Sequence, residues 1–256
     1  MSKAKIALFI HLILLIFPLD SFASREFKVY PAQTAAEGEL EISYWNNLTT
    51  SNEEPYLFKG TPVSKTDLME HTLELEYGMT ERLTFEAYLD YEQPKGESLQ
   101  YVQTRAVLAR YHLIDEDDAG IGVSFYFEYE LPERDYDPDQ DIDFRIMLEK
   151  SFDRWTIRLN PVFTKNTFGP DGSEGVGFEY GAGIYWRNFH RVVPALEFFG
   201  ELGDLSSGSS HIHYIFPGFE INFGTGWKWN AGVGFGLTDQ SDRMVIKNII
   251  SYSRFF

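Results

Sequence analysis

Apolar and polar residues alternate with a period of two along nearly the whole chain from residue 39 onward. Segment 83–92 shows this most clearly, because Phe85 and Leu89 share one parity and Glu86 has the other. Successive side chains of a β-strand point to opposite faces, so this pattern predicts a strand with one apolar and one polar face. Its length is also the roughly ten residues that a tilted strand needs to cross a bilayer.

About twelve segments carry this alternation, and the connections between them alternate in length. The segments are 39–44, 72–77, 83–92, 107–113, 121–130, 142–149, 155–163, 178–186, 192–201, 212–223, 229–237 and 244–256. The short connections are 79–82, 114–118, 151–154, 187–190 and 224–227, and the mostly longer ones are 46–67, 93–98, 131–140, 166–175 and 203–210. This predicts an all-β fold, a transmembrane antiparallel up-and-down β-barrel of about twelve strands, with both termini at the end of the short turns. No linker divides the chain, so we expect a single domain.

The alternation also predicts which way individual side chains point in two of the segments. Val107 has the parity of the apolar face in its segment. In segment 212–223 the apolar parity switches at Pro217 and Gly218, where a bulge or break is the simplest account. Inward glycines either leave space for a path or mark close packing or curvature; they are Gly120, Gly122, Gly181 and Gly183.

The first residues have the features of a secretory signal peptide. Lys3 and Lys5 form a positive region, and residues 6–19 are apolar but too few for a stable membrane-spanning helix. Small residues allow cleavage after Ala23, so we expect residues 1–23 to be removed and the barrel to occupy residues 24–256. A retained signal anchor is the alternative. The chain has no Cys, which excludes lipidation behind the cleavage site and disulfides.

The carboxy-terminal strand carries a motif of its own. Phe256 is the last residue, and Tyr252, Ile250 and Ile246 share its face. This motif resembles the last strand of bacterial outer-membrane β-barrels, whose aromatic carboxy-terminus is read by the barrel assembly machinery. The resemblance implies location in the bacterial outer membrane, with Tyr252 and Phe256 as the assembly signal. It also implies the assembly machinery and outer-membrane lipid as partners.

Composition and charge agree with that reading. Aromatic residues make up 16% of the chain, and a barrel in lipid uses them for its interfacial girdles and outer band. The formal net charge is −17, which argues against nucleic acid as a partner.

The inward face of the predicted strands is acidic, with a few basic residues between the carboxylates. The candidate lumen-lining residues are Glu74, Glu76, Glu86, Asp90, Glu128, Arg110, Arg145, Arg158, Glu179 and Glu197. Two interpretations stay open. The charges pair with one another and fill a narrow barrel, or they line a hydrated pore that favours cations or hydroxylated solutes.

The pattern predicts no catalytic residues, no metal site and no cofactor. No G-x-S-x-G signature is present. Some outer-membrane phospholipases have a lipid-facing Ser–His pair, and His71 is the clearest outward His here. His211 and His213 share one face, but a structural metal site needs about four ligands.

The run 193–201, together with residues 214–218, resembles the transporter family linked to phenol-degradation (MetA-pathway) operons. That family consists of outer-membrane barrels that pass small, often aromatic, solutes. We therefore expect an outer-membrane channel or transporter that passes small solutes through an acidic lumen, as a monomer or homo-oligomer. The alternative is a closed structural or surface-interaction barrel without transport.

Overall fold

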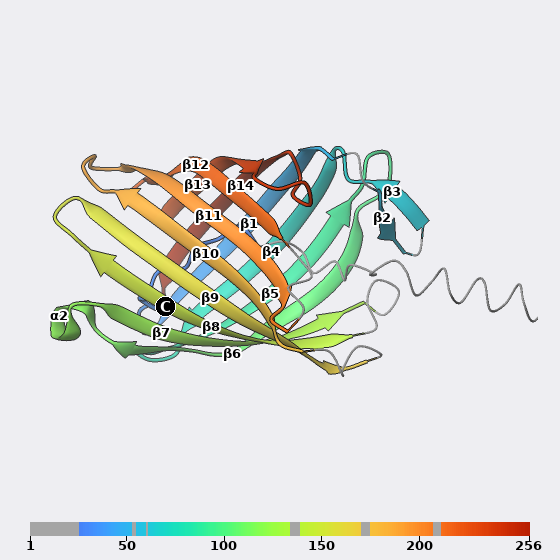
Figure 1. The fold of residues 1–256 in the computed structure, drawn as a ribbon. Coiled ribbons are helices and arrows are strands. Elements are labelled where there is room, and N and C mark those ends of the chain that lie inside the picture. The colour runs from blue at the N-terminus through green and yellow to red at the C-terminus, as the bar shows by residue number, and fades with distance from the viewer. Residues whose placement is uncertain (1–25, 53–54, 60, 134–138, 170–174, 207–210) are drawn as a thin grey trace, which may run out of the picture.

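Twelve antiparallel strands form a closed barrel in the computed structural model (Figure 1), so the predicted fold class is confirmed. The structure describes residues 26–52, 55–59, 61–133, 139–169, 175–206 and 211–256, and the predicted signal peptide lies outside them. The barrel strands are β1 (Glu39–Ser51), β4 (Leu68–Gly78), β5 (Leu83–Gln93), β6 (Gln100–Ile114), β7 (Gly122–Pro132), β8 (Gln140–Ser151), β9 (Trp155–Phe168), β10 (Gly177–Trp186), β11 (Val192–Asp204), β12 (Ile212–Asn222), β13 (Trp227–Gly236) and β14 (Met244–Phe255).

The barrel closes between its first and last strands. Strands β4 to β14 each pair with their neighbours in sequence, and β1 pairs with both β4 and β14. At the closing seam Tyr44 lies opposite Ile250, and Ser43 lies opposite Ser251. Closure leaves no sheet edge, so the backbone groups are paired between strands, which is the condition for crossing lipid.

The two ends of the barrel differ in their connections (Figure 1). One end has short turns, including α2 (Glu116–Ala119), and also holds the carboxy-terminus, where the Phe256 N–H donates to Gly38 O at 3.0 Å. The other end has the longer connections. The predicted loop 46–67 contains an unforeseen hairpin there, β2 (Pro55–Phe58) and β3 (Thr61–Ser64). Short turns are typical of the periplasmic end of such barrels.

The outer surface of the barrel is apolar. On β5, Phe85 is 41% exposed and Leu89 is 37% exposed, whereas Glu86 and Asp90 are 4% and 0% exposed. Large apolar side chains on the outside of a closed barrel contact lipid, so the predicted register of β5 is correct. None of the helices in the described residues is long and apolar enough to span a membrane.

The expected bulge or break at Pro217 and Gly218 is wrong. β12 is one unbroken strand, and its register with β13 is the same on both sides of these two residues. The apolar residues change parity in the sequence because Tyr214 and Phe216 point inward, where they are 2% and 0% exposed. Their inner face is apolar because both rings pack on Phe27.

The expected outward position of Val107 is also wrong, since this side chain is 2% exposed inside the barrel. The pairing of β6 with β7 shifts between Val107 and Ala109. Such a bulge inserts one residue and reverses the parity of the strand. As a result Arg105 before the bulge and Arg110 and His112 after it all lie inside, at 2%, 2% and 6% exposure. Alternation alone therefore missed Arg105.

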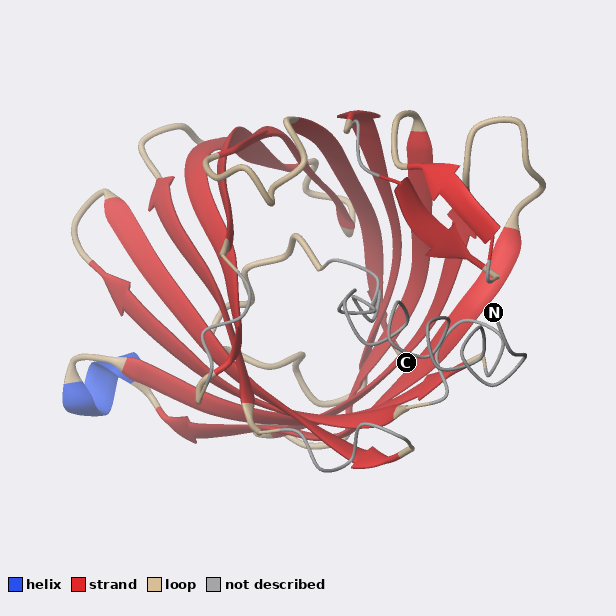
Figure 2. Ribbon diagram, turned by 45° about the vertical axis from the view of Figure 1, so that its right-hand side comes forward, coloured by secondary structure: helices blue, strands red, loops and turns tan. Residues whose placement is uncertain are grey.

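Residues 26–38, called the lumen segment below, run inside the ring of strands before β1 begins (Figure 2). Phe27, Val29, Tyr30 and Ala32 of this segment are at most 4% exposed. The sequence predicted that the amino-terminus lies at the end of the short turns, but that terminus is outside the described residues. Glu26, the first described residue, lines a cavity of the interior, a position that the sequence did not predict.

Candidate pore lumen

Every predicted lumen-lining side chain points into the barrel interior. Arg158 and Glu179 line the two cavities described below. The others are at most 7% exposed: Glu74, Glu76, Glu86, Asp90, Glu128, Arg110, Arg145 and Glu197. The alternation places them there, but their partners come from other strands and from the lumen segment.

Lys28 ties the lumen segment to the wall at β4. Its Nζ donates to both carboxylate oxygens of Glu74, at 2.7 and 2.8 Å. The ammonium also lies 4.5 Å from the ring centroid of Tyr30 and 5.0 Å from that of Trp45. Trp45 Nε1 donates to the same carboxylate at 3.0 Å. Because Glu74 is only 1% exposed, loss of Lys28 would leave a buried charge without its counter-ion.

Arg110 holds the next part of the segment. Its Nη1 donates to Glu86 at 3.0 Å and to Glu76 at 3.3 Å. Its Nη2 donates to the backbone carbonyls of Pro31 and Gln33, at 3.0 and 2.7 Å. One guanidinium therefore pairs with carboxylates of two strands and binds two carbonyls of the lumen segment.

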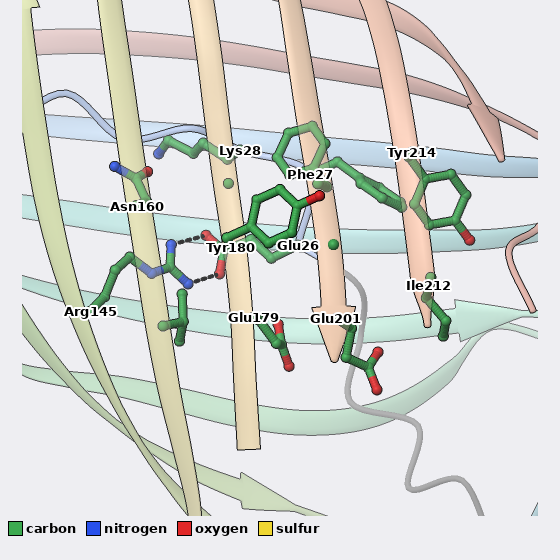
Figure 3. Close-up of a pocket in the computed structure, with 14 residues that line it drawn as sticks. Glu26, Phe27, Lys28, Arg145, Asn160, Glu179, Tyr180, Glu201, Ile212 and Tyr214 are labelled. Carbon is green, nitrogen blue, oxygen red and sulfur yellow. Dashed lines mark hydrogen bonds and ion pairs between the residues drawn. The ribbon is translucent and has the colours of Figure 1, made fainter. Parts of the chain in front are cut away.

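Glu26 is held by two arginines near the end of the described segment. Arg145 donates to both of its carboxylate oxygens, at 3.1 and 2.8 Å (Figure 3). Arg105 lies 3.3 Å from the same carboxylate. The Nε of Arg105 also donates to Asp90 at 2.8 Å, and its Nη1 lies 3.5 Å from Glu128. This bidentate and branched pairing is what the planar guanidinium favours.

Aromatic side chains of β12 pack against Phe27, on the side of the lumen segment away from the arginines. Its ring centroid lies 5.3 Å from that of Tyr214 and 4.7 Å from that of Phe216. Lys247 donates to the Phe27 carbonyl at 2.9 Å and forms an ion pair with Glu197. The lumen segment is therefore packed on its apolar side as well as tied by charges.

A Ser–His–Asp arrangement that sequence reasoning missed lies beside Ala32. His112 Nδ1 is 3.0 Å from Ser124 Oγ, and its Nε2 is 2.8 Å from Asp115 Oδ1. The hydrogen bond with His112 lowers the pKa of the Asp115 carboxyl, which lies at the short-turn rim. Ser124 is 0% exposed, and its hydroxyl donates to the Ala32 carbonyl. A carbonyl of the lumen segment thus takes the place that a substrate would need, so the three side chains hold the segment.

Two cavities flank the lumen segment. The first, about 60 Å³, is lined by Glu179 and Glu201 from β10 and β11 (Figure 3). The second, about 520 Å³, is lined by Arg158 and Lys228, among others. Lys28 lines both cavities, so the lumen segment forms the wall between them.

Carboxylates outnumber basic groups inside the barrel. Among the buried polar side chains of the described residues, 12 are Asp or Glu and 5 are Lys or Arg. Glu179 and Glu201 lie directly opposite each other on β10 and β11, and no salt bridge within the described residues involves either. Like charges in this position repel unless water or a cation screens them. The first cavity therefore brings together two carboxyl groups that have no salt-bridge partner among the described residues.

The inward glycines do not leave an open path. A Cβ on Gly122 would lie 3.1 Å from the Cβ of Ala32, and one on Gly181 would lie 3.6 Å from Val29. The lumen segment occupies the space that these glycines provide. Gly120 has a different role, because it ends α2 with a φ of +76°.

The three histidines considered as candidates for a metal or catalytic site lie at the rims or on the outer face. His213 is hydrogen-bonded to Tyr180 at 3.1 Å, and His211 is exposed. The outward His71 is hydrogen-bonded to the hydroxyl of Tyr44 at 2.6 Å, not to a serine.

The predicted assembly signal lies at the end of β14. The Tyr252 ring packs against Trp227 with 4.9 Å between ring centroids. Phe256 is 81% exposed beyond the strand, where another protein could reach it.

Comparisons with known proteins establish the type of barrel. No family model and no curated protein sequence matches the chain. The COG4313 outer membrane channel from Pseudomonas putida F1 is similar in structure, with a TM-score of 0.64, 14% identity and coverage of 90% of this chain and 100% of that one. The KdgM porin has a TM-score of 0.58 at 12% identity, covering 84% of this chain and 99% of its own. The KdgM porin in complex with disordered oligogalacturonate gives 0.56 at 11% identity with the same coverage.

These likenesses show the fold. The protein is a β-barrel of the bacterial outer-membrane type, as the sequence predicts, and the similar structures include channels and porins. The transporter family linked to phenol-degradation operons is not confirmed by the comparisons.

Proposed function

We propose that the protein is an outer-membrane channel that passes small solutes through an acidic lumen. The observation that carries this proposal is the pair of cavities, about 60 and 520 Å³, on the two sides of the lumen segment in one closed barrel. Charged side chains line both cavities. Such groups are costly to bury without water or ionic partners, so the cavities are suited to hold water and hydrophilic solutes.

Cations and uncharged hydroxylated molecules are the solutes that this lumen favours. Low-dielectric walls focus the potential of the excess carboxylates, which raises the local concentration of cations and lowers that of anions. One KdgM porin structure contains disordered oligogalacturonate, which is an acidic polymer. An acidic lumen would repel such a molecule, so we do not extend that substrate to this chain.

The lumen segment limits the size of what can pass. Its residues lie between the two cavities, and Lys28, Arg110 and Arg145 attach it to three different strands. Solutes larger than small hydrated ions would therefore require the segment to move within the barrel.

A closed barrel without transport is the second candidate, and the same segment favours it. Phe27, Tyr30 and Ala32 are almost fully buried, as in a permanently filled interior. The hairpin of β2 and β3 would then serve as a contact surface at the rim (Figure 1).

The remaining assignments follow from the architecture. We propose that the barrel assembly machinery reads Tyr252 and Phe256, that lipid surrounds the apolar outer face, and that the barrel acts alone or as a homo-oligomer. We assign no catalytic residue, because Ser124, the best-placed nucleophile of the described residues, is committed to the Ala32 carbonyl.

A reversible lock on the lumen segment tests the proposal. The positions of Ala32 and Gly122 would place two Cβ atoms 3.1 Å apart, close to the 3.5–4.5 Å range of disulfides. The chain has no native Cys, so the double variant A32C/G122C can be oxidised without side reactions. Liposome swelling with a small neutral sugar measures uptake, and the unmodified chain serves as the control under both redox conditions.

We expect swelling with the unmodified chain and with the reduced variant, and much slower swelling after oxidation. If folded, unmodified protein gives no swelling and reduction of the variant changes nothing, the closed barrel replaces the channel. If oxidation leaves swelling unchanged, solutes pass without displacing the segment.

A further inference from the structure

We infer that the interior holds a divalent-cation site, suited to Ca²⁺, formed by Glu128, Glu130 and Asp143. One carboxylate oxygen from each residue lies within 4.8 Å of the others. The three side chains are 0%, 8% and 8% exposed, so the cluster is enclosed by the barrel.

The fold explains this convergence. Glu128 on β7 lies directly opposite Asp143 on β8, and Glu130 follows Glu128 on the same face of β7. Ca²⁺ binds oxygen at 2.3–2.6 Å, so two of its ligands can be separated by at most about 5 Å. The observed spread fits one ion between the three carboxylates.

The hydrogen bonds and ion pairs of the three carboxylates leave some of their oxygen atoms without a partner. Glu128 accepts a hydrogen bond from the Tyr126 hydroxyl and lies 3.5 Å from Arg105. Asp143 Oδ1 is buried and accepts no hydrogen bond. Of the salt bridges within the described residues, none involves Glu130 or Asp143. A buried carboxylate oxygen without a partner points to an additional ligand, and a bound cation would also reduce the repulsion in this cluster.

The donor set selects a hard cation. All three ligands are carboxylates, which suit Ca²⁺ better than Zn²⁺, whose structural sites use mainly Cys and His. Without an ion, the three carboxylates have Arg105 and Arg145 as neighbouring positive charges, but Arg105 also pairs with Asp90 and Arg145 with Glu26. Oxygen sites in extracellular proteins bind Ca²⁺ with dissociation constants of roughly 10⁻⁴–10⁻³ M, and we expect the same range here.

Terbium binding tests the site in the folded, purified full barrel. Tb³⁺ replaces Ca²⁺ at oxygen sites, and Tyr126 lies close enough to Glu128 to sensitise its luminescence. We expect a saturable signal with one ion for each barrel that CaCl₂ displaces. The isosteric variants Asp143→Asn and Glu130→Gln should each weaken Tb³⁺ binding by about tenfold or more, as loss of one charged ligand does.

Glu220→Gln is the matched control. Glu220 is an inward carboxylate that lies 3.5 Å from Arg158 and lines the second cavity, whereas the cluster lines neither cavity, so its loss should leave Tb³⁺ binding within about twofold. Signal without saturation, or equal weakening by Asp143→Asn and Glu220→Gln, would show diffuse screening and overturn the site. If Asp143→Asn does not fold, Glu130→Gln is used to test the site. Its carboxylate forms no ion pair within the described residues, so this substitution should not disturb the fold. Binding is measured without conductance, so failure of the channel proposal would not affect this result.

Discussion

Replacing Lys28 by Met removes one charge from the lumen segment and little else. The Met side chain keeps the apolar stem that packs on the rings of Tyr30 and Trp45. Glu74, which is 1% exposed, keeps only the Trp45 N–H as a partner among these contacts. The barrel strands are untouched, so the expected effect is release of the segment, without unfolding of the barrel.

The size of the effect follows from the burial of the ion pair. Removing one partner of a buried pair costs about 3–5 kcal/mol, because the other charge stays in a poor environment. The Lys28 side chain is 17% exposed, so water can partly replace it, and the lower end, about 3 kcal/mol, is appropriate. Since 1.4 kcal/mol is tenfold in an equilibrium constant, the population with a released segment should rise roughly 100-fold.

Thiol labelling measures this population. Val29 is 4% exposed in the segment, and Val29→Cys supplies the only thiol of the chain. The rate of reaction with a membrane-impermeant maleimide should rise roughly 100-fold when Lys28→Met is added. The control is Lys228→Met, because Lys228 forms its ion pair with Glu41 at 2.8 Å and is 51% exposed. Exposed pairs contribute about 0–1 kcal/mol, so the control should change the rate less than about fivefold. Equal rates for both variants, or full labelling before either change, would refute the reasoning.

Three further predictions concern assembly, side-chain direction and selectivity. Deletion of Phe256 should lower the yield of heat-modifiable barrel in membranes and leave unfolded protein in the periplasm, and a normal yield would remove its role as a signal. A thiol at Glu86 should react with an impermeant reagent once the lumen segment is released, and one at Phe85 should stay protected by lipid; the reverse order would contradict the register. Replacing Glu179 and Glu201 by Gln should reduce cation preference measured by reversal potential, because neither carboxylate has an ion-pair partner within the described residues. An unchanged reversal potential would place the selective charges elsewhere.

The outer face of the barrel could be predicted from the sequence because lipid imposes one rule on every strand. A charge facing lipid costs about 2–4 kcal/mol near the midplane, so outward positions such as Phe85 and Leu89 must be apolar. Strand positions follow from the same rule, whereas the carboxy-terminal motif was identified by its resemblance to the last strand of outer-membrane barrels. The direction of Phe216 could not be predicted from this rule, because an apolar residue is also allowed inside the barrel, where Phe216 packs on Phe27.

The interior could not be predicted to the same depth because its pairs depend on long-range register. Arg105 meets Asp90 across β5 and β6, and one bulge beyond Val107 decides which residues of β6 turn inward. The lumen segment alternates only over residues 27–30, which is too short a run to predict where the segment lies. Its side chains contact different strands one by one, so no longer periodic pattern is required. Glu86, Asp90 and Glu128 were therefore recognised as inward residues, but the arginine that each contacts was not predicted.

Single-channel recording of the purified barrel in planar bilayers under a salt gradient tests the proposed function most directly. The account predicts small, cation-selective conductance that increases when Lys28→Met releases the lumen segment. The preference should weaken as the Debye length falls from about 10 Å at 0.1 M salt to about 3 Å at 1 M. Anion preference, or no conductance in folded protein with or without Lys28→Met, would contradict the channel and leave a closed barrel.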